Sequence, residues 1–127
     1  MSLLLDSQAL LWAMSDSRRL GPNARALIQA QADTVSVSVA SIWELAIKHS
    51  RGGIDLPGDF VEKVGEAGFE VLPASAGLCW QAAHLPPHHG DPFDRLIIAQ
   101  ALAGALAVMT TDAVFPQYGV AVIDAGR

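Results

Sequence analysis

Four acidic residues are spaced so that their carboxylates would lie together at one edge of a sheet: Asp6, Glu44, Asp94 and Asp112. Asp6 and Asp112 each follow a short apolar segment typical of a buried strand, whereas Glu44 and Asp94 lie near the starts of expected helices. Carboxylates in one crevice repel each other, and binding a cation relieves that repulsion. Because oxygen-only ligation favours Mg²⁺ or Mn²⁺ over zinc, the four acids predict a divalent-metal centre.

Such a centre suits the hydrolysis of phosphate esters. Mg²⁺ keeps several of its waters, and one of them can be the nucleophile, while a second ion can stabilise the leaving oxygen in an in-line displacement at phosphorus. The hydroxyls of Ser7, Thr110 and Thr111 are near enough in the pattern to bond to these acids or to a substrate phosphate.

Each acid also has an ordinary structural explanation. Asp94, in a first helical turn, meets the positive end of the helix dipole, and Asp112 can cap a short turn before Val114. Glu44 can pair with Lys48 one turn along its helix, which contributes only about 0.3 kcal/mol. The functional interpretation therefore rests on the convergence of all four acids.

A helix over residues 92–103 followed by a strand over residues 106–111 would bring two of the acids together. Asp91 is a good N-cap for this helix, and proline suits its first position. The helix would run roughly 18 Å and the strand would return roughly 20 Å. Asp94 and Asp112 then lie at the carboxyl edge of a parallel sheet, where open α/β sheets bind their ligands.

Strand-like and helix-like patterns alternate along the rest of the chain. The expected strands cover residues 2–5, 34–39, 69–73, 106–111 and 120–124. The expected helices cover residues 7–14, 23–31, 40–49, 57–66, 74–83 and 92–103. Five strands alternating with helices predict a three-layer α/β/α fold with a five-stranded parallel sheet.

Composition limits the class of protein. The 127 residues predict one domain over residues 1–127, and the hydrophobic fraction of 51% indicates a large core or a surface covered by a partner. A net charge of −5 argues against a general nucleic-acid coat. No apolar run approaches the ~18 residues of a membrane span, and the start MSLLLD lacks a basic region, so we expect a cytoplasmic protein. The single Cys79 is expected to be a small buried hydrophobic residue.

Four segments resemble the PIN-domain family, and more narrowly the VapC-type toxins of bacterial toxin–antitoxin pairs. In chain order they are LLLDSQALLW, SVSVASIWELAIKHSRGGIDLP, LPPHHGDPFDRLIIAQA and AVMTTDAVFPQYGV. DPFDRLIIAQA and SIWELAIK are the specific parts, whereas TTD alone would be weak. The resemblance covers essentially the whole chain. It implies a parallel sheet of strand order 3-2-1-4-5 and an endoribonuclease that depends on Mg²⁺ or Mn²⁺.

The resemblance also implies roles for individual residues. It suggests Asp6, Glu44 and Asp94 as the core catalytic and metal-binding acids, and Asp112 matches a more variable fourth acid. Asp91 is a further candidate near the metal, although its position as an N-cap explains it equally well.

Three partners follow from the same resemblance: an RNA substrate, a second copy of the chain in a homodimer, and a small antitoxin protein that blocks the active-site groove. The two protein contacts would account for the apolar excess, including Leu11 and Trp12 on a short helix. Gln8 stands where relatives often carry histidine, so this chain departs from the pattern there.

Three basic residues lie closest to the expected crevice and are candidates for binding substrate phosphates: Lys48, Arg51 and Arg95. Each can equally carry a helix-face charge or pair with a neighbouring acid. His88 and His89 precede the helix that carries Asp94, and as loop residues we expect them to be solvated rather than to bind a ligand.

Two other classes of protein are compatible with parts of this pattern. The sparse basic residues would suit a catalytically inactive PIN-like interaction module, although retention of all four acids argues against one. A phosphoacceptor receiver domain also places acids at the carboxyl edge of five strands. That class needs a lysine after its last strand, where this chain has Asp124 and Ala125.

Overall fold

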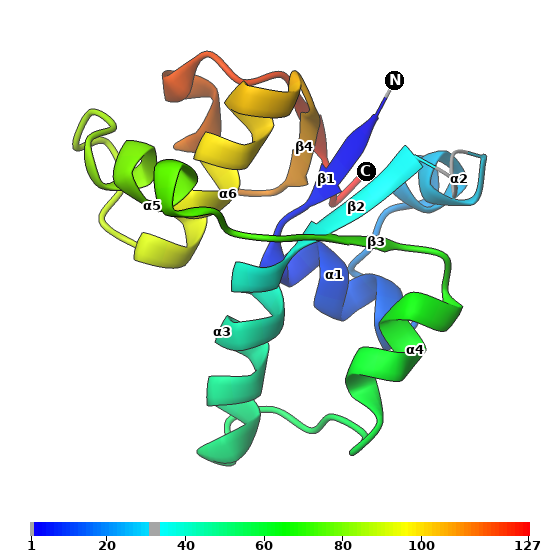
Figure 1. The fold of residues 1–127 in the computed structure, drawn as a ribbon. Coiled ribbons are helices and arrows are strands. Elements are labelled where there is room, and N and C mark those ends of the chain that lie inside the picture. The colour runs from blue at the N-terminus through cyan, green and yellow to red at the C-terminus, as the bar shows by residue number, and fades with distance from the viewer. Residues whose placement is uncertain (1, 31–33) are drawn as a thin grey trace.

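A five-stranded parallel sheet runs through the computed structural model, which describes residues 2–30 and 34–127 (Figure 1). The strands are β1 (Leu3–Leu5), β2 (Val35–Ser38), β3 (Glu70–Leu72), β4 (Ala107–Thr110) and β5 (Val122–Asp124). Their order is β3-β2-β1-β4-β5 with every neighbouring pair parallel, which confirms the expected architecture and strand order. Receiver domains have the order 2-1-3-4-5, so the receiver hypothesis is wrong.

Helices connect these strands close to the expected positions. They are α1 (Ser7–Met14), α2 (Pro22–Ala30), α3 (Val39–Ser50), α4 (Phe60–Glu66), α5 (Ala76–Ala83) and α6 (Pro92–Gly104), with a short 3-10 helix, η2, over Phe115–Tyr118. The helix expected from residue 57 begins at Phe60 because a turn comes first, in which the Phe60 N–H donates to the Pro57 carbonyl (3.2 Å). The expected end of the second helix at residue 31 lies outside the described residues. In the part of the chain that is described, no helix has the length and apolar character needed to cross a membrane.

The central strands bury side chains on both faces because helices cover both sides of the sheet (Figure 1). Leu3 and Leu5 point to one face and pack in a core with residues of α1, α2, α3 and α4. Leu4 and Val108 point to the other face, where Ile97 of α6 covers them. This alternation is the period of two that a strand imposes on its side chains, and it produces three layers.

The register of the sheet aligns the carboxyl ends of its three central strands. Leu5 in β1 pairs with Val37 in β2 and with Met109 in β4. The Asp6 N–H continues this ladder by donating to the Met109 carbonyl (3.1 Å). The residues that follow these strands, together with the starts of α1 and α3, therefore lie at one edge of the sheet.

Helix α5 exposes a residue that we expected to be buried. Cys79 is exposed, so the expectation of a buried small hydrophobic residue is wrong. The helix buries Ala82, whereas Trp80 is 71% exposed. Because α5 is apolar on nearly every side, its sequence pattern does not indicate which side packs against the rest of the molecule.

Candidate active site

All five acids considered in the sequence line one cleft at the carboxyl edge of the sheet. The cleft has a volume of about 530 Å³. Its acidic lining consists of Asp6, Glu44, Asp91, Asp94 and Asp112. These residues come from four separate parts of the chain, so the fold, and not local sequence, brings them together.

Asp6 lies at the junction of β1 and α1 and is the N-cap of that helix. Its Oδ1 accepts a hydrogen bond from the Ala9 N–H (2.8 Å), and this bond fixes the orientation of the carboxylate. Only 6% of Asp6 is exposed. Burial raises the pKa of its carboxyl; hydrogen bonds from the Thr110 hydroxyl and the Ala9 N–H oppose the rise, and the charges of Asp112 and Glu44 add to it.

Glu44 lines the cleft, and its two carboxylate oxygens have different surroundings. A buried hydrogen bond from Ser7 Oγ to Ser41 Oγ (3.0 Å) ties α1 to α3, the helix that carries Glu44. Glu44 Oε2 lies 3.6 Å from Lys48 Nζ, so the expected helical pair forms. Glu44 Oε1 is buried and has no hydrogen-bond partner among the described residues. A buried oxygen without a hydrogen-bond partner lowers the stability of the folded protein, and a bound cation would supply the missing partner.

The start of α6 supplies two acids with different surroundings. Asp91 caps the helix as expected, because its Oδ1 accepts from two backbone N–H groups at 2.8 Å and 3.3 Å. The Asp94 side chain is only 19% exposed. Burial raises the pKa of Asp94 to about 7; the charges of Asp91, Glu44 and Asp6 contribute to the rise, and His89 opposes it. Near neutral pH this carboxyl can therefore exchange its proton for a cation.

Asp112 caps a turn and also faces the cleft. Its Oδ1 accepts from the Val114 N–H (2.9 Å), which is the ordinary role that the sequence suggested. Its own N–H donates to Thr110 Oγ1 (2.9 Å), so the backbone of this turn is held from both sides. The second carboxylate oxygen, Oδ2, lies 2.9 Å from His89 Nε2.

His89 lies inside the acid cluster and not in solvent. Its Nε2 is 2.9 Å from Asp112 Oδ2 and 3.0 Å from Asp94 Oδ2, and its side chain is 15% exposed. The expectation of a solvated loop residue is therefore wrong for His89, whereas His88 is exposed and packs edge-on against Tyr118. One nitrogen or oxygen atom from each of His89, Asp94 and Asp112 lies within 4.8 Å of the other two, so the three side chains form one compact cluster.

Two basic side chains border the cleft. Lys48 lines it and is 54% exposed. Arg19, in the loop after α1, lines it as well, although no pattern in the sequence singles it out. Arg51 follows the end of α3, is exposed and is not among the residues that line the cleft. Lys48 and Arg19 are thus the two basic residues that line the cleft in the described part of the chain.

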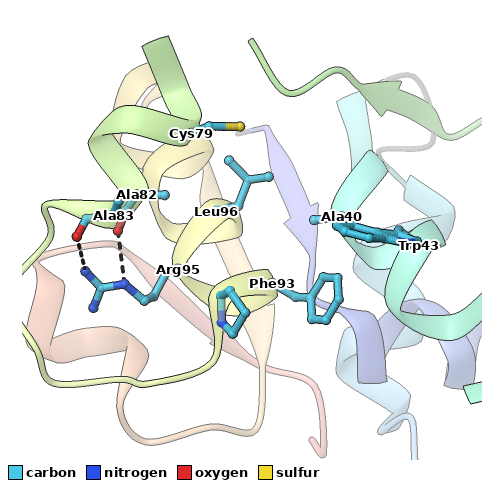
Figure 2. Close-up of a pocket in the computed structure, with 9 residues that line it drawn as sticks. Ala40, Trp43, Cys79, Ala82, Ala83, Phe93, Arg95 and Leu96 are labelled. Carbon is cyan, nitrogen blue, oxygen red and sulfur yellow. Dashed lines mark hydrogen bonds between the residues drawn. The ribbon is translucent and has the colours of Figure 1, made fainter. Parts of the chain in front are cut away.

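The guanidinium group of Arg95 holds the loop between α5 and α6. It donates to five backbone carbonyls at 2.7 to 3.3 Å, those of Ala82, Ala83, Leu85, Pro86 and His89. Figure 2 shows two of these bonds, beside an apolar hollow of about 360 Å³ into which Trp43 and Phe93 project. Arg95 does not line the acidic cleft, so this geometry gives it a loop-holding role and does not favour contact with substrate phosphates.

Arg95→Met is expected to lower the free energy of unfolding by about 2–4 kcal/mol, because it removes five charge-assisted hydrogen bonds at once. Urea unfolding of both proteins measures the change. Arg51→Met is the matched control, because Arg51 is exposed and its loss should change stability by less than about 0.5 kcal/mol. Equal effects of the two substitutions would contradict the role assigned to Arg95.

The donor set in the cleft fits a hard divalent cation. It offers carboxylate oxygens, including the buried Glu44 Oε1, which has no hydrogen-bond partner in residues 2–30 and 34–127, and the Asp94 carboxyl with a pKa of about 7. The single thiol, Cys79, lies at the apolar hollow and not in this cleft. Mg²⁺ or Mn²⁺ would be held by Asp6, Glu44, Asp94 and Asp112, with Asp91 beside them.

The strand order and the cluster of carboxylates define a small α/β domain with an acidic centre at its carboxyl edge. The chain belongs to the PIN domain family, whose model matches residues 3–121 and so includes every acid of the cleft. Proteins of this family are generally nucleases. The resemblance seen in the sequence is therefore confirmed. No curated protein sequence matches the chain significantly.

Solved structures share the fold over nearly the whole chain. FitAcB from Neisseria gonorrhoeae has a TM-score of 0.71 at 19% identity, and the match covers 97% of each chain. VapBC2 from Rickettsia felis, bound to a DNA fragment from its promoter, has a TM-score of 0.71 at 14% identity, covering 97% of this chain and 98% of the other. A toxin–antitoxin complex from Klebsiella pneumoniae has a TM-score of 0.69 at 16% identity, covering 98% of each. At these identities the likeness establishes the fold.

Proposed function

We propose that the protein is a Mg²⁺- or Mn²⁺-dependent endoribonuclease that acts as the toxin of a toxin–antitoxin pair. The observation that carries this proposal is the meeting of Asp6, Glu44, Asp94 and Asp112 in one cleft of a PIN domain. Four carboxylates converge there from separate segments, although their mutual repulsion opposes folding. A site that binds a cation and cuts phosphodiester bonds accounts for that arrangement.

The charge and position of each side chain in the cleft indicate its role in the proposed reaction. A divalent ion held by Asp6, Glu44, Asp94 and Asp112 would supply Lewis acidity for activating a water and neutralising phosphate charge. The Asp6 carboxylate is oriented by its hydrogen bond from the Ala9 N–H, and the Glu44 carboxylate has one buried oxygen. Asp94 releases its proton near neutral pH. Lys48 and Arg19 at the border of the cleft attract the RNA backbone without reading its sequence.

Two protein partners accompany this function. A related fold was solved in a toxin–antitoxin complex, and we infer that this chain also binds an antitoxin protein, which covers its cleft. A second copy is proposed at the apolar hollow between α3, α5 and α6 (Figure 2), where Trp43 is 65% exposed beside Phe93. A toxin of this kind would act in the cytoplasm, where its RNA substrate is found.

A catalytically inactive interaction module is the second candidate. It is favoured by the small number of bases at the cleft, where only Lys48 and Arg19 line it among the described residues. The buried oxygen of Glu44 argues against it, because a module without a cation would gain stability by losing that carboxylate.

Expression of the chain in a bacterial host tests the proposal. We expect induction to stop growth and to produce discrete RNA fragments, and we expect induction of Asp94→Asn at equal protein level to do neither. Growth arrest of equal strength by the substituted protein would show that the arrest does not depend on the acidic cleft and would favour the interaction module.

A further inference from the structure

The position of His89 is determined by contacts with three other segments. Arg95 Nη1 donates to the His89 carbonyl (2.9 Å), and the His89 N–H donates to the hydroxyl of Tyr118 (2.8 Å). The same hydroxyl donates to the Pro86 carbonyl (2.6 Å), which closes the loop around it. The imidazole packs edge-on against Phe115, with ring centroids 6.1 Å apart. The loop is therefore built so that this ring enters the acid cluster.

The hydrogen bonds of the ring identify which nitrogen carries the proton. The backbone N–H of Asp91 donates to His89 Nδ1 (3.1 Å), so Nδ1 acts as an acceptor and is unprotonated. The proton of the neutral ring is then on Nε2, which faces Oδ2 of both Asp94 and Asp112. A nitrogen that carries a proton cannot bind a metal ion, so in this geometry His89 is a donor to the acids and not a ligand.

We propose that His89 is a positioning residue that orients Asp94 and Asp112 for the cation by donating its Nε2–H to their Oδ2 atoms. The proposal rests on the metal-dependent function proposed above. Both oxygens of Asp112 then accept a hydrogen bond that orients the carboxylate, because the Val114 N–H donates to its Oδ1. In Asp94 only Oδ2 accepts from His89, and Oδ1 takes no part in this hydrogen bond.

The expected consequence is an effect on metal affinity. Without the shared donor, the Asp94 and Asp112 carboxylates would repel each other and rotate apart. Hydrogen bonds to ligating groups typically change metal affinity or activity 10- to 100-fold. His89→Ala should therefore weaken Mn²⁺ binding by about 10-fold or more, because the carboxylates would have to be ordered when the ion binds.

Calorimetric titration with Mn²⁺ tests the proposal in purified full-length protein. The variants are His89→Ala, His89→Gln and His89→Asn, with His88→Ala as the control from the same loop. The glutamine amide extends about as far as Nε2 and can donate to both acids, whereas the asparagine amide is too short. We expect binding by His89→Gln to stay within about 3-fold of wild type and binding by His89→Asn to resemble that of His89→Ala. His88→Ala should match the wild type.

Three outcomes would overturn the proposal. Unchanged or tighter Mn²⁺ binding by His89→Ala would reject it, and so would equal weakening by the glutamine and asparagine variants. If Asp94→Asn abolishes binding while His89→Ala retains it, the metal centre stands and only the role of His89 falls. Absence of Mn²⁺ binding by the wild type would reject both. Thermal unfolding with a chelator establishes that each variant compared is folded.

Discussion

Asp94→Asn is expected to lower the rate of RNA cleavage at least about 100-fold while leaving the protein folded. Asparagine keeps the shape of the side chain, and its amide oxygen can still accept from His89 Nε2, which is 3.0 Å from the carboxylate in the wild type. It removes the negative charge that a divalent cation requires. The stability of the metal-free protein should not fall, because Asp91, Glu44 and Asp6 all repel this charge.

The matched control is Asp59→Asn, which makes the same chemical change at the exposed start of α4. It should cleave RNA like the wild type. The rates are measured on one RNA oligonucleotide at saturating Mg²⁺, with circular dichroism to compare folding. Cleavage by Asp94→Asn at the wild-type rate would place the active centre elsewhere.

The stability of the metal-free protein is expected to fall as pH rises from about 4 to about 7. Burial raises the folded-state pKa of Asp94 to about 7 from its ordinary value of 3.8, so between these values the folded protein keeps a proton that the unfolded chain has lost. Stability therefore declines by up to about 1.4 kcal/mol per pH unit and levels off above pH 7. The raised pKa of Asp6 acts in the same direction.

Urea unfolding of the wild type and Asp94→Asn across this pH range, with a chelator present, isolates the contribution of Asp94. As pH rises, the free energy of unfolding should fall less for Asp94→Asn than for the wild type. The difference between the two proteins should therefore widen toward pH 7. Mn²⁺ affinity of the wild type should rise about tenfold per pH unit up to pH 7, because binding releases one proton. Parallel stability curves and an affinity independent of pH would contradict the environment described for Asp94.

The convergence of the acids could be predicted because it depends on topology alone. Asp6 follows β1. The lengths expected for the helix over residues 92–103 and the strand over residues 106–111 are nearly equal, so the chain returns to the same edge and the approach of Asp94 and Asp112 needs no knowledge of side-chain packing. The expected ordinary roles were also present: Asp91 is an N-cap and Asp112 caps a turn. A carboxylate can perform both roles because it has two oxygens.

The surroundings of these acids could not be predicted from patterns along the chain. His89 turns into the cluster because Arg95 and Tyr118 hold its loop, and Tyr118 is 29 residues away. The sequence did contain a signal about Arg95. Neighbouring residues on a helix point about 100° apart, so Arg95 cannot share the direction of Asp94. Cys79 was misplaced because an almost uniformly apolar helix does not show which of its sides is buried.

Cleavage of total cellular RNA by the purified protein is the direct test of whether this chain is a metal-dependent nuclease. The reactions contain Mg²⁺, Mn²⁺ or a chelator, and Asp94→Asn purified in parallel controls for contaminating nucleases. We expect discrete fragments that require the metal and are absent with the substituted protein, and their ends should define the cleavage site. Fragments that persist in the chelator, or that Asp94→Asn produces equally, would contradict a metal-dependent centre formed by Asp6, Glu44, Asp94 and Asp112.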